Sequence, residues 1–162
     1  MIRLIAALDT KRGISKGGIQ PWFIPDDEKY FQEQTSKWGG EVLMGSNTYG
    51  VIGHALSNRK NYVASRNAAA VNGAEVVSDL GAFLKAFERD LWVIGGASVF
   101  EQALPYAEEI YLTEIQADFG CDKFFPRIAG TFMPFGEDAL QEQNGFVYKF
   151  AVYAKREKAN MY

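Results

Sequence analysis

The stretch Leu91–Pro105, LWVIGGASVFEQALP, is the part of the chain that decides the fold. Its first four residues form a continuous apolar run with the length of a buried strand, and Gly95-Gly96 interrupts that run. The residues from Ala97 to Leu104 are compatible with a helix, and Pro105 is expected to end it. The stretch therefore predicts a strand, a double-glycine turn and a helix.

The double glycine also suggests a binding site. Two residues without side chains allow a ligand to approach the backbone closely, and a helix that begins at about Ala97 or Ser98 directs free N–H groups and a positive dipole end at the same gap. Such a place suits an anion, for example the pyrophosphate of a dinucleotide. The motif is neither a full G-x-G-x-x-G nor a G-x-x-x-x-G-K-[ST] loop, and a plain tight turn fits it equally well.

Length and composition indicate one ordinary globular domain. The chain has 162 residues, of which 48% are hydrophobic and 23% charged. The net charge of −3 argues against a nucleic-acid partner, which normally requires a basic face. The single Cys121 is compatible with a reducing cytoplasm, and one cysteine with one histidine rules out a cysteine–histidine metal cluster.

The N-terminal region predicts a strand followed by a lid. Ile2–Leu8 is an apolar run interrupted only by Arg3, which indicates a central strand and not a signal peptide, and no apolar run approaches the ~20 residues that span a bilayer. Asp9–Phe23 is long, polar and glycine-rich, as active-site lids often are. A solvated surface loop is the alternative, although Trp22 and its apolar neighbours would be costly to expose.

The first helix is predicted over Pro25–Lys37, with proline and acidic residues at its start. Asp27, Phe31 and Thr35 lie four residues apart and share one stripe. An acid on the same stripe as an aromatic residue is unusual for a helix that faces a core. The alternative is that Asp27 only complements the dipole of the first turn.

A second strand–glycine–helix unit follows. Glu41–Met44 is a short apolar strand that ends at Gly45, and the side chains of Ser46, Asn47 and Thr48 are expected to cap a short helix that runs toward Ile52. The next loop contains His54, the only histidine, which we expect to be exposed and not catalytic.

The rest of the chain alternates strands with one more helix and then contains strands alone. Asp79 is expected to cap a helix over Leu80–Phe87, whose apolar side chains share one face. The last strand is expected near the sheet edge, paired to its predecessors by hairpins, and the tail Glu157–Tyr162 is expected to fray. The predicted strands of this part are Tyr62–Ala64, Val76–Val77, Glu109–Ile115, Thr131–Phe135 and Phe146–Ala154. The early alternation predicts a mostly parallel sheet covered by helices on both faces.

Several polar and glycine-rich segments follow the carboxyl ends of the predicted parallel strands, where ligands bind in open α/β sheets. The lid follows the first strand, Gly45–Thr48 the second and Gly95-Gly96 the third, and Arg66 follows a fourth. The helix that carries Asp27 comes directly after the lid. One cleft is therefore expected to contain a dinucleotide, a buried acid and a gate.

Six segments in order carry a resemblance over nearly the whole chain: MIRLIAAL, IQPW-x-x-P-x-D, VLMGSNTYGVIG, RKNYVASR, WVIGGASVFEQALP and IYLTEI. Together they resemble the dihydrofolate reductase family. The resemblance implies a single domain over residues 1–162, with a predominantly parallel eight-stranded sheet, an antiparallel C-terminal strand and helices on both faces. It also implies a cytoplasmic monomer that is a target of antifolate inhibitors, with no bound metal and no membrane or nucleic-acid partner.

The implied reaction is hydride transfer from NADPH to carbon 6 of dihydrofolate, with protonation of the adjacent nitrogen. By resemblance, Asp27 is the one ionisable group in the pterin pocket, Thr113 bonds to it, and Trp22 helps to fix an ordered water. A carboxylate suits the pterin because it accepts two parallel hydrogen bonds, and burial beside Phe31 should raise its pKa. Arg59 resembles the arginine that binds the substrate's glutamate carboxylate.

The resemblance assigns the remaining site residues position by position. The substrate is implied to contact Ile5, Ala7, Asp27, Glu28, Phe31, Thr35, Ile52, Leu56, Arg59, Ile94, Phe100 and Thr113. The cofactor is implied to contact Ala7, Ile14, Gln20, Gly45, Ser46, Asn47, Thr48, Ser65, Arg66, Gly95, Gly96, Ala97, Ser98, Val99 and Phe100. The bond between Gly95 and Gly96 is expected to be cis.

Several positions depart from the family pattern. Ser46 stands where an arginine usually binds the 2′-phosphate, so Arg66 is left to provide that charge. Glu28 lies beside the acid at a position that is often apolar, and Ser15, Gln20 and Cys121 alter the lid and the segment before Asp122. By resemblance Asp122 holds the closed lid. Two alternatives remain: a pyrimidine reductase of riboflavin synthesis, which is similar in fold and cofactor use, and a non-catalytic pterin- or nucleotide-binding module.

Overall fold

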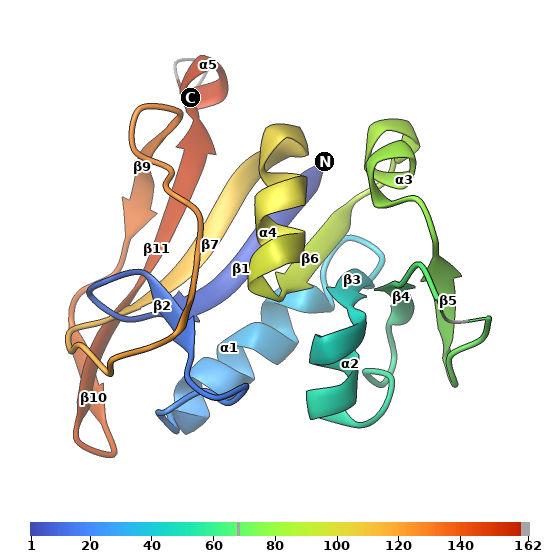
Figure 1. Cartoon of the computed structure of the whole chain (residues 1–162). Coiled ribbons are helices and arrows are strands. Elements are labelled where there is room, and N and C mark those ends of the chain that lie inside the picture. The colour runs from blue at the N-terminus through green and yellow to red at the C-terminus, as the bar shows by residue number, and fades with distance from the viewer. Residues whose placement is uncertain (68, 160–162) are drawn as a thin grey trace.

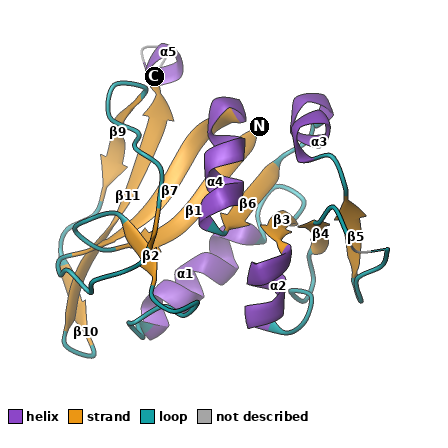
Figure 2. Ribbon diagram, in the orientation of Figure 1, coloured by secondary structure: helices purple, strands orange, loops and turns teal. Residues whose placement is uncertain are grey.

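The computed structural model describes residues 1–67 and 69–159, and its centre is a twisted sheet (Figures 1 and 2). Eight strands follow one another in the order β10-β11-β7-β1-β6-β3-β4-β5, and β9 pairs with β11 beside this path. The strands are β1 Ile2–Leu8, β2 Gly13–Ser15, β3 Glu41–Gly45, β4 Lys60–Ala64, β5 Ala74–Val77, β6 Leu91–Gly95, β7 Ala107–Ile115, β8 Lys123–Phe124, β9 Phe132–Glu137, β10 Gln141–Gln143 and β11 Phe146–Lys155. The helical segments are α1 Pro25–Thr35, α2 Ser46–Ile52, α3 Leu80–Ala86, α4 Ala97–Ala103, the 3₁₀ turn η1 Leu104–Tyr106 and α5 Arg156–Ala159.

Strand directions confirm the predicted fold class. The pairs β1–β6, β1–β7, β3–β6, β3–β4 and β4–β5 are parallel. The C-terminal strand β11 runs antiparallel to β7, β9 and β10. The sheet therefore has the expected parallel core and antiparallel C-terminal strand, with β9 as a ninth strand in the described part of the chain.

Alternation along the strands builds two apolar layers, one on each face of the sheet. Ile2 and Leu4 of β1 pack with α3 and α4, whereas Ile5 of the same strand packs with Phe31 of α1 and Ile52 of α2. Successive side chains of a strand point to opposite faces, so one short apolar run supplies both layers. Helices therefore cover both faces, as the alternating pattern predicted.

The helix over Leu80–Phe87 is confirmed as α3. Asp79 accepts a hydrogen bond from the backbone N–H of Ala82 at 3.1 Å, so it is the predicted cap. Leu84 is buried in the layer of α4, and Leu80, Phe83 and Phe87 pack against that layer. The apolar stripe read from the sequence is therefore the face that this helix buries.

Two local predictions are confirmed and two are wrong. The α-helix α4 ends at Ala103, directly before the 3₁₀ turn η1 that contains Pro105, so the helix ends where the proline predicted. The last strand β11 lies near the sheet edge as expected, with only β10 beyond it on the strand path. The segment predicted as a loop over Asp9–Phe23, in contrast, contains β2, which pairs with β8. The tail expected to fray from Glu157 forms α5 as far as Ala159, and residues 160–162 lie outside the described residues.

Within the described residues, no helix is both long and apolar enough to cross a membrane.

Candidate active site

The acid of the site is Asp27, in the first turn of α1. Its carboxylate accepts a hydrogen bond of 2.5 Å from the Oγ1–H of Thr113, which is 86 residues away in sequence and only 2% exposed. Thr113 lies in β7 opposite Ala7 of β1, so the two central strands and the helix after the lid meet at this point. The stripe position of Asp27 therefore faces the sheet, and its side chain does not serve the helix dipole alone.

Burial changes the acidity of this carboxyl group. Removal from water raises the pKa of Asp27 to about 6, and the neighbouring Glu28 carboxylate adds to the rise. The hydrogen bond from Thr113 acts in the opposite direction, because it favours the charged form. An acid with a pKa of about 6 exchanges protons readily near neutral pH.

Apolar residues line the face of the sheet next to Asp27. Ile5 and Leu56 are buried in one layer, and Phe31, Ile52 and Ile94 are partly buried against it. Ala7 and Trp22 belong to an adjoining cluster. The structure therefore brings together most of the apolar residues predicted for the substrate, whereas Phe100 lies in the layer on the opposite face of the sheet.

The other end of α1 carries a second polar contact. Thr35 is buried, donates its hydroxyl to the carbonyl of Phe31, and accepts a hydrogen bond of 2.8 Å from Nη1 of Arg59. Partial burial lowers the pKa of Arg59 from its usual value. Thr35 lies eight positions after Asp27 in α1, a rise of about 12 Å. One helix thus places a carboxylate and a guanidinium at two ends of an apolar surface.

A buried asparagine that was not predicted from the sequence supports Arg59. The side chain of Asn61 accepts a hydrogen bond from the N–H of Leu56 and donates to the carbonyls of Leu56 and Arg59, at 2.8–2.9 Å. These bonds fix the loop between α2 and β4. The only sequence signal was its place directly after Arg-Lys.

The glycine segments of β3 and β6 form a second part of the site. Met44 pairs with Gly95, and the peptide bond between Gly95 and Gly96 is cis, as expected. A Cβ on Gly45 would lie 3.1 Å from Cγ2 of Val99, and one on Gly96 would lie 3.4 Å from Oγ1 of Thr48. A side chain at Gly45 would therefore make a tight contact with Val99, and one at Gly96 would fill the space beside Thr48.

Two helices begin at this gap. The cap residues of α2 and α4 are Gly45 and Gly96, and no side chain of the described residues caps either helix. The prediction that Ser46, Asn47 and Thr48 cap α2 is therefore wrong. They instead form the first turn of that helix, whose N–H groups point, like those of α4, toward the gap. This backbone cradle suits an anion.

The remaining residues predicted for the cofactor lie at the starts of α2 and α4, directly after β4, or in the lid. Ser46, Asn47, Arg66 and Ser98 are exposed, whereas Ser65 and Ala97 are partly buried. Ser65 follows β4 and donates its N–H to Val77. In the lid, Ile14 is buried and Gln20 is exposed. His54 is exposed, and no group of three or more possible metal ligands occurs among residues 1–67 and 69–159.

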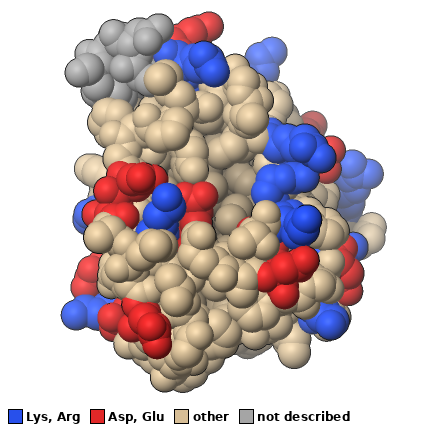
Figure 3. Space-filling model, turned by 90° about the vertical axis from the view of Figure 1, so that its left-hand side faces the viewer, with Lys and Arg blue, Asp and Glu red and all other residues tan. Residues whose placement is uncertain are grey.

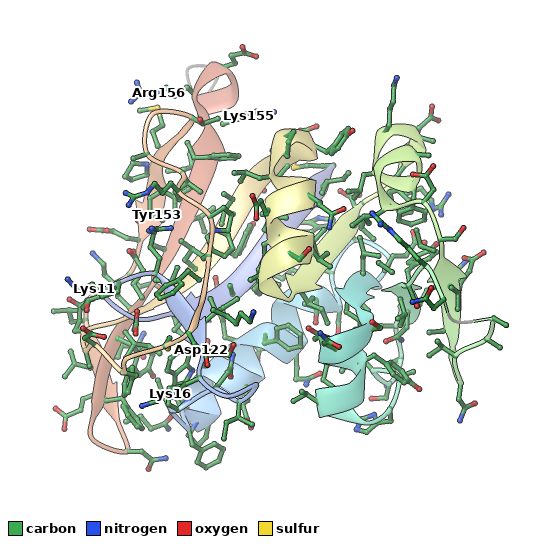
Figure 4. All side chains as sticks on the ribbon, in the orientation of Figure 1. Lys11, Lys16, Asp122, Tyr153, Lys155 and Arg156 are labelled. Carbon is green, nitrogen blue, oxygen red and sulfur yellow. The ribbon has the colours of Figure 1, made fainter. Side chains whose placement is uncertain are left out.

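The lid is held against the loop that precedes β8. Asp122 accepts a hydrogen bond from the N–H of Gly17 at 3.0 Å, and its own N–H donates to the carbonyl of Ser15 at 3.0 Å. Figure 4 shows Asp122 beside β2 and close to Lys16. Trp22, at the end of the lid, is 7% exposed, and its Nε1–H finds no hydrogen-bond partner among the described residues.

Comparison with known proteins identifies the family of this chain. The family model for dihydrofolate reductase matches residues 1–155. The dihydrofolate reductase of Bacillus subtilis (strain 168) is 35% identical over 162 residues, which cover 96% of this chain and 95% of the relative. The type A13 dihydrofolate reductase of Escherichia coli is 35% identical over 160 residues, covering 96% and 94%.

Solved structures agree with the sequence relatives. Dihydrofolate reductase from Enterococcus faecalis, complexed with NADP(H) and RAB-propyl, superposes with a TM-score of 0.85 at 26% sequence identity. The match covers 96% of each chain, so the whole architecture is shared.

Proposed function

This chain belongs to the dihydrofolate reductase family and reduces 7,8-dihydrofolate to 5,6,7,8-tetrahydrofolate with NADPH, and we propose that Asp27 handles the proton of this reaction. Tetrahydrofolate supports one-carbon metabolism and thymidylate synthesis. The observation that carries the proposal is the partly buried Asp27 carboxyl, bonded to Thr113 and with a pKa raised to about 6. No feature of the site favours the pyrimidine reductase or the non-catalytic module.

Asp27 has two tasks in this proposal. Its carboxylate accepts parallel hydrogen bonds from a ring nitrogen and the amino group of the pterin, which orients the ring in the apolar pocket. Its raised pKa also favours delivery of a proton toward the nitrogen next to carbon 6. Thr113 holds one oxygen of the carboxyl group in place during both tasks.

Trp22 closes the pocket from the lid side. Its ring lies in the same cluster as Ala7, and its buried Nε1–H remains available to bind a polar atom in the pocket. We assign it the role of orienting a water molecule near the pterin and excluding bulk solvent. Both roles raise the strength of the electrostatic contacts within the site.

The backbone cradle at the starts of α2 and α4 fits NADPH, which supplies the hydride that reaches carbon 6 of the pterin. The first turns of α2 and α4 offer N–H groups to a pyrophosphate, and the space beside Gly95 and Gly96 accepts no side chain without contact. Ala7, Ile14 and Gln20 are assigned to the nicotinamide half. Ser65 and Arg66, which follow β4, are assigned to the adenosine half.

Arg59 is assigned to the glutamate carboxylate of the substrate. Nη1 and Nε of its guanidinium are bonded to Thr35 and to the carbonyl of Ser57, which orients the planar group. A preoriented guanidinium loses less conformational freedom when it binds a carboxylate. Glu28, in the first turn of α1, is assigned to the aminobenzoyl portion of the substrate and to antifolate inhibitors.

Initial rates with dihydrofolate test the assignment, with NADPH and NADH compared for the wild-type protein and Arg66→Ala. We expect NADPH to be strongly preferred, and the preference to be lost in Arg66→Ala, because Ser46 provides no charge for the 2′-phosphate. Equal use of NADH by the wild-type protein would contradict the role of Arg66. Oxidation of neither cofactor would contradict the enzyme itself.

Partners and location complete the proposal. We propose that residues 1–162 act as one domain and as a cytoplasmic monomer without a nucleic-acid partner. The net charge of −3 supports the absence of a nucleic-acid partner, and Figure 3 shows both acidic and basic side chains on the face that forms the left-hand side of Figure 1. Size-exclusion chromatography with light scattering tests the monomer, and a mass twice that of the chain would contradict it.

A further inference from the structure

Asp9 is a buried acid that the proposed reaction does not use. It follows β1 directly and is only 2% exposed. Its Oδ1 accepts hydrogen bonds from the N–H groups of Lys11 and Gly13 at 2.9 and 2.7 Å, and its Oδ2 accepts one from Phe119 at 3.1 Å. The thiol of Cys121 bonds to the same carboxylate. One side chain thus binds both the start of the lid and a loop 110 residues away.

Backbone bonds surround this carboxylate. The N–H of Thr10 donates to the carbonyl of Ala117, and the N–H of Phe125 donates to the carbonyl of Arg12. The same two chain segments are joined again where Asp122 meets Ser15 and Gly17, as described above. Asp9 lies between these backbone bonds and is the only side chain of the lid that bonds to both segments within the described part of the chain.

The loop that Asp9 binds, residues 117–122, also packs against Trp22. The ring of Phe119 packs against the ring of Trp22, with 5.3 Å between their centroids and an interplanar angle of 53°. Cys121 belongs to the same buried cluster as Trp22. Both contacts of Asp9 on this loop are therefore made by residues of the cluster that contains Trp22, and one of them, Phe119, packs directly on the Trp22 ring.

Gly13 makes this arrangement possible. A Cβ on Gly13 would lie 2.4 Å from the Cβ of Cys121 and 2.9 Å from Oδ1 of Asp9. The absence of a side chain at this position lets the Cys121 side chain and the Asp9 carboxylate lie directly against the lid backbone. The packing leaves little room for the loop to shift while the bonds to Asp9 are intact.

We propose that Asp9 is a positioning residue of the reaction: its carboxylate fixes Phe119 and Cys121 against the lid and thereby sets the position of Trp22 in the site. This inference rests on the proposed function only for its effect on rate. Asp9 touches neither pterin nor cofactor in this proposal. Its effect passes through the loop to the ring of Trp22.

The test is Asp9→Asn, measured as the full chain in two independent ways. The asparagine retains the shape but presents an NH₂ group where the carboxylate received N–H or thiol donors, so at least one bond is lost. Replacement of the tryptophans by 5-fluorotryptophan gives ¹⁹F signals for Trp22, Trp38 and Trp92, with Trp22→Phe used for assignment. Single-turnover oxidation of NADPH by dihydrofolate gives the rate of hydride transfer.

We expect the Trp22 signal to shift or broaden while those of Trp38 and Trp92 stay in place. We expect the single-turnover rate to fall roughly tenfold, because small misplacements of catalytic groups are costly, with less than about a twofold change in KM for dihydrofolate. Asp118→Asn is the matched control, since Asp118 is exposed in the same loop and accepts a bond from Gly120. It should leave both readouts unchanged.

Unchanged Trp22 signal and unchanged rate in a folded Asp9→Asn protein would overturn the proposal. If Asp9→Asn does not fold, Phe119→Leu decides, because it keeps the Asp9 bonds and removes the ring that packs on Trp22. It should shift the Trp22 signal and lower the rate, and wild-type values for both would overturn the proposal. The ¹⁹F readout needs no activity, so failure of the enzyme assignment would remain distinguishable.

Discussion

Two aspartates near the two ends of the lid have pKa values shifted in opposite directions. Asp9 is the first residue of the lid and Asp27 follows the lid in α1, and each is withdrawn from water. The pKa of Asp9 is lowered, since the N–H groups of Gly13, Phe119 and Lys11 and the thiol of Cys121 together outweigh its burial. The pKa of Asp27 is raised to about 6, since one hydroxyl does not outweigh burial and a neighbouring carboxylate.

The difference shows that the number of donors around a buried carboxylate decides what it does. A carboxylate that accepts several backbone N–H bonds stays charged and acts as a fixed connection between segments. A carboxylate with a single donor is left with acceptor capacity and a pKa useful for proton transfer. In this chain the first arrangement positions the lid, and the second provides the chemistry of the site.

The largest expected effect is on catalysis by Asp27→Asn. Removal of the titratable group should lower kcat/KM at pH 7 by roughly 10²–10⁴-fold, the usual contribution of general acid–base catalysis. The wild-type rate should fall as pH rises through about 6, and the variant should lose this dependence. Asp26→Asn, at the exposed neighbouring position, should behave like the wild type. Full activity of Asp27→Asn at neutral pH would remove Asp27 from the mechanism.

The same substitution at the two aspartates should change stability in opposite directions. The folded-state pKa of Asp27 is raised, so its contribution to stability is present below about pH 4 and is lost as pH rises through about 6. Asp27→Asn cannot ionise, and should exceed the wild type by about 1–2 kcal/mol in free energy of unfolding at pH 7.

Asp9→Asn should instead be less stable than the wild type at pH 7 by about 1–3 kcal/mol, because buried donors lose their acceptor. The lowered pKa of Asp9 means that its contribution is present above about pH 4 and disappears as pH falls through its folded value. Urea unfolding of both variants between pH 3 and 8 measures the two differences. If both substitutions changed the free energy of unfolding in the same direction at pH 7, the contrast between the two sites would be contradicted.

A smaller effect is expected when the single donor to Asp27 is removed. Thr113→Val keeps the shape of the side chain but loses the bond that favours the charged form. The midpoint of the pH–rate profile should move upward from about 6, and kcat/KM below that midpoint, where Asp27 is protonated in both proteins, should fall about tenfold because the carboxyl group is less well oriented. Thr131→Val, at an exposed position, is the control. A midpoint that moves downward would refute the role of this bond.

The smallest effect concerns Glu28. Its carboxylate raises the pKa of Asp27, so Glu28→Gln should move the midpoint downward, by a few tenths of a pH unit because Glu28 is exposed and screened. About 1 M NaCl should produce a similar shift in the wild type, since the Debye length then falls to about 3 Å. Glu33→Gln, farther along α1, should have no effect. An equal midpoint shift in Glu28→Gln and Glu33→Gln would show that the shift comes from the overall charge of the protein and not from the nearness of Glu28 to Asp27.

Strand and helix periodicity correctly predicted the elements that hold the site. The apolar run before Gly95 is β6, the residues after Gly96 are α4, and the acidic stripe position of Asp27 lies on α1. These predictions succeeded because hydrophobic period and glycine punctuation are local properties of the chain. The resemblance then identified the family, which the relatives confirm.

Predictions that depended on neighbours were less successful. β11 is rich in β-branched and aromatic residues, but its composition did not reveal that β10 would cover its outer side. Ser46, Asn47 and Thr48 have the chemistry of caps, but Gly45 occupies the cap position. In each case the deciding contact comes from a segment or a backbone geometry that local pattern does not encode.

The sequence by itself determined the strands and helices of the parallel sheet and the family, because these follow from apolar spacing, glycines and motif order. The resemblance predicted the raised pKa of Asp27, but only the tertiary structure decided that Asp9 has a lowered pKa and joins two segments, because the two side chains are chemically identical. Their partners Phe119 and Thr113 lie 110 and 86 residues away along the chain. Burial and the number of hydrogen-bond donors exist only once those distant segments have packed together, and they set each pKa.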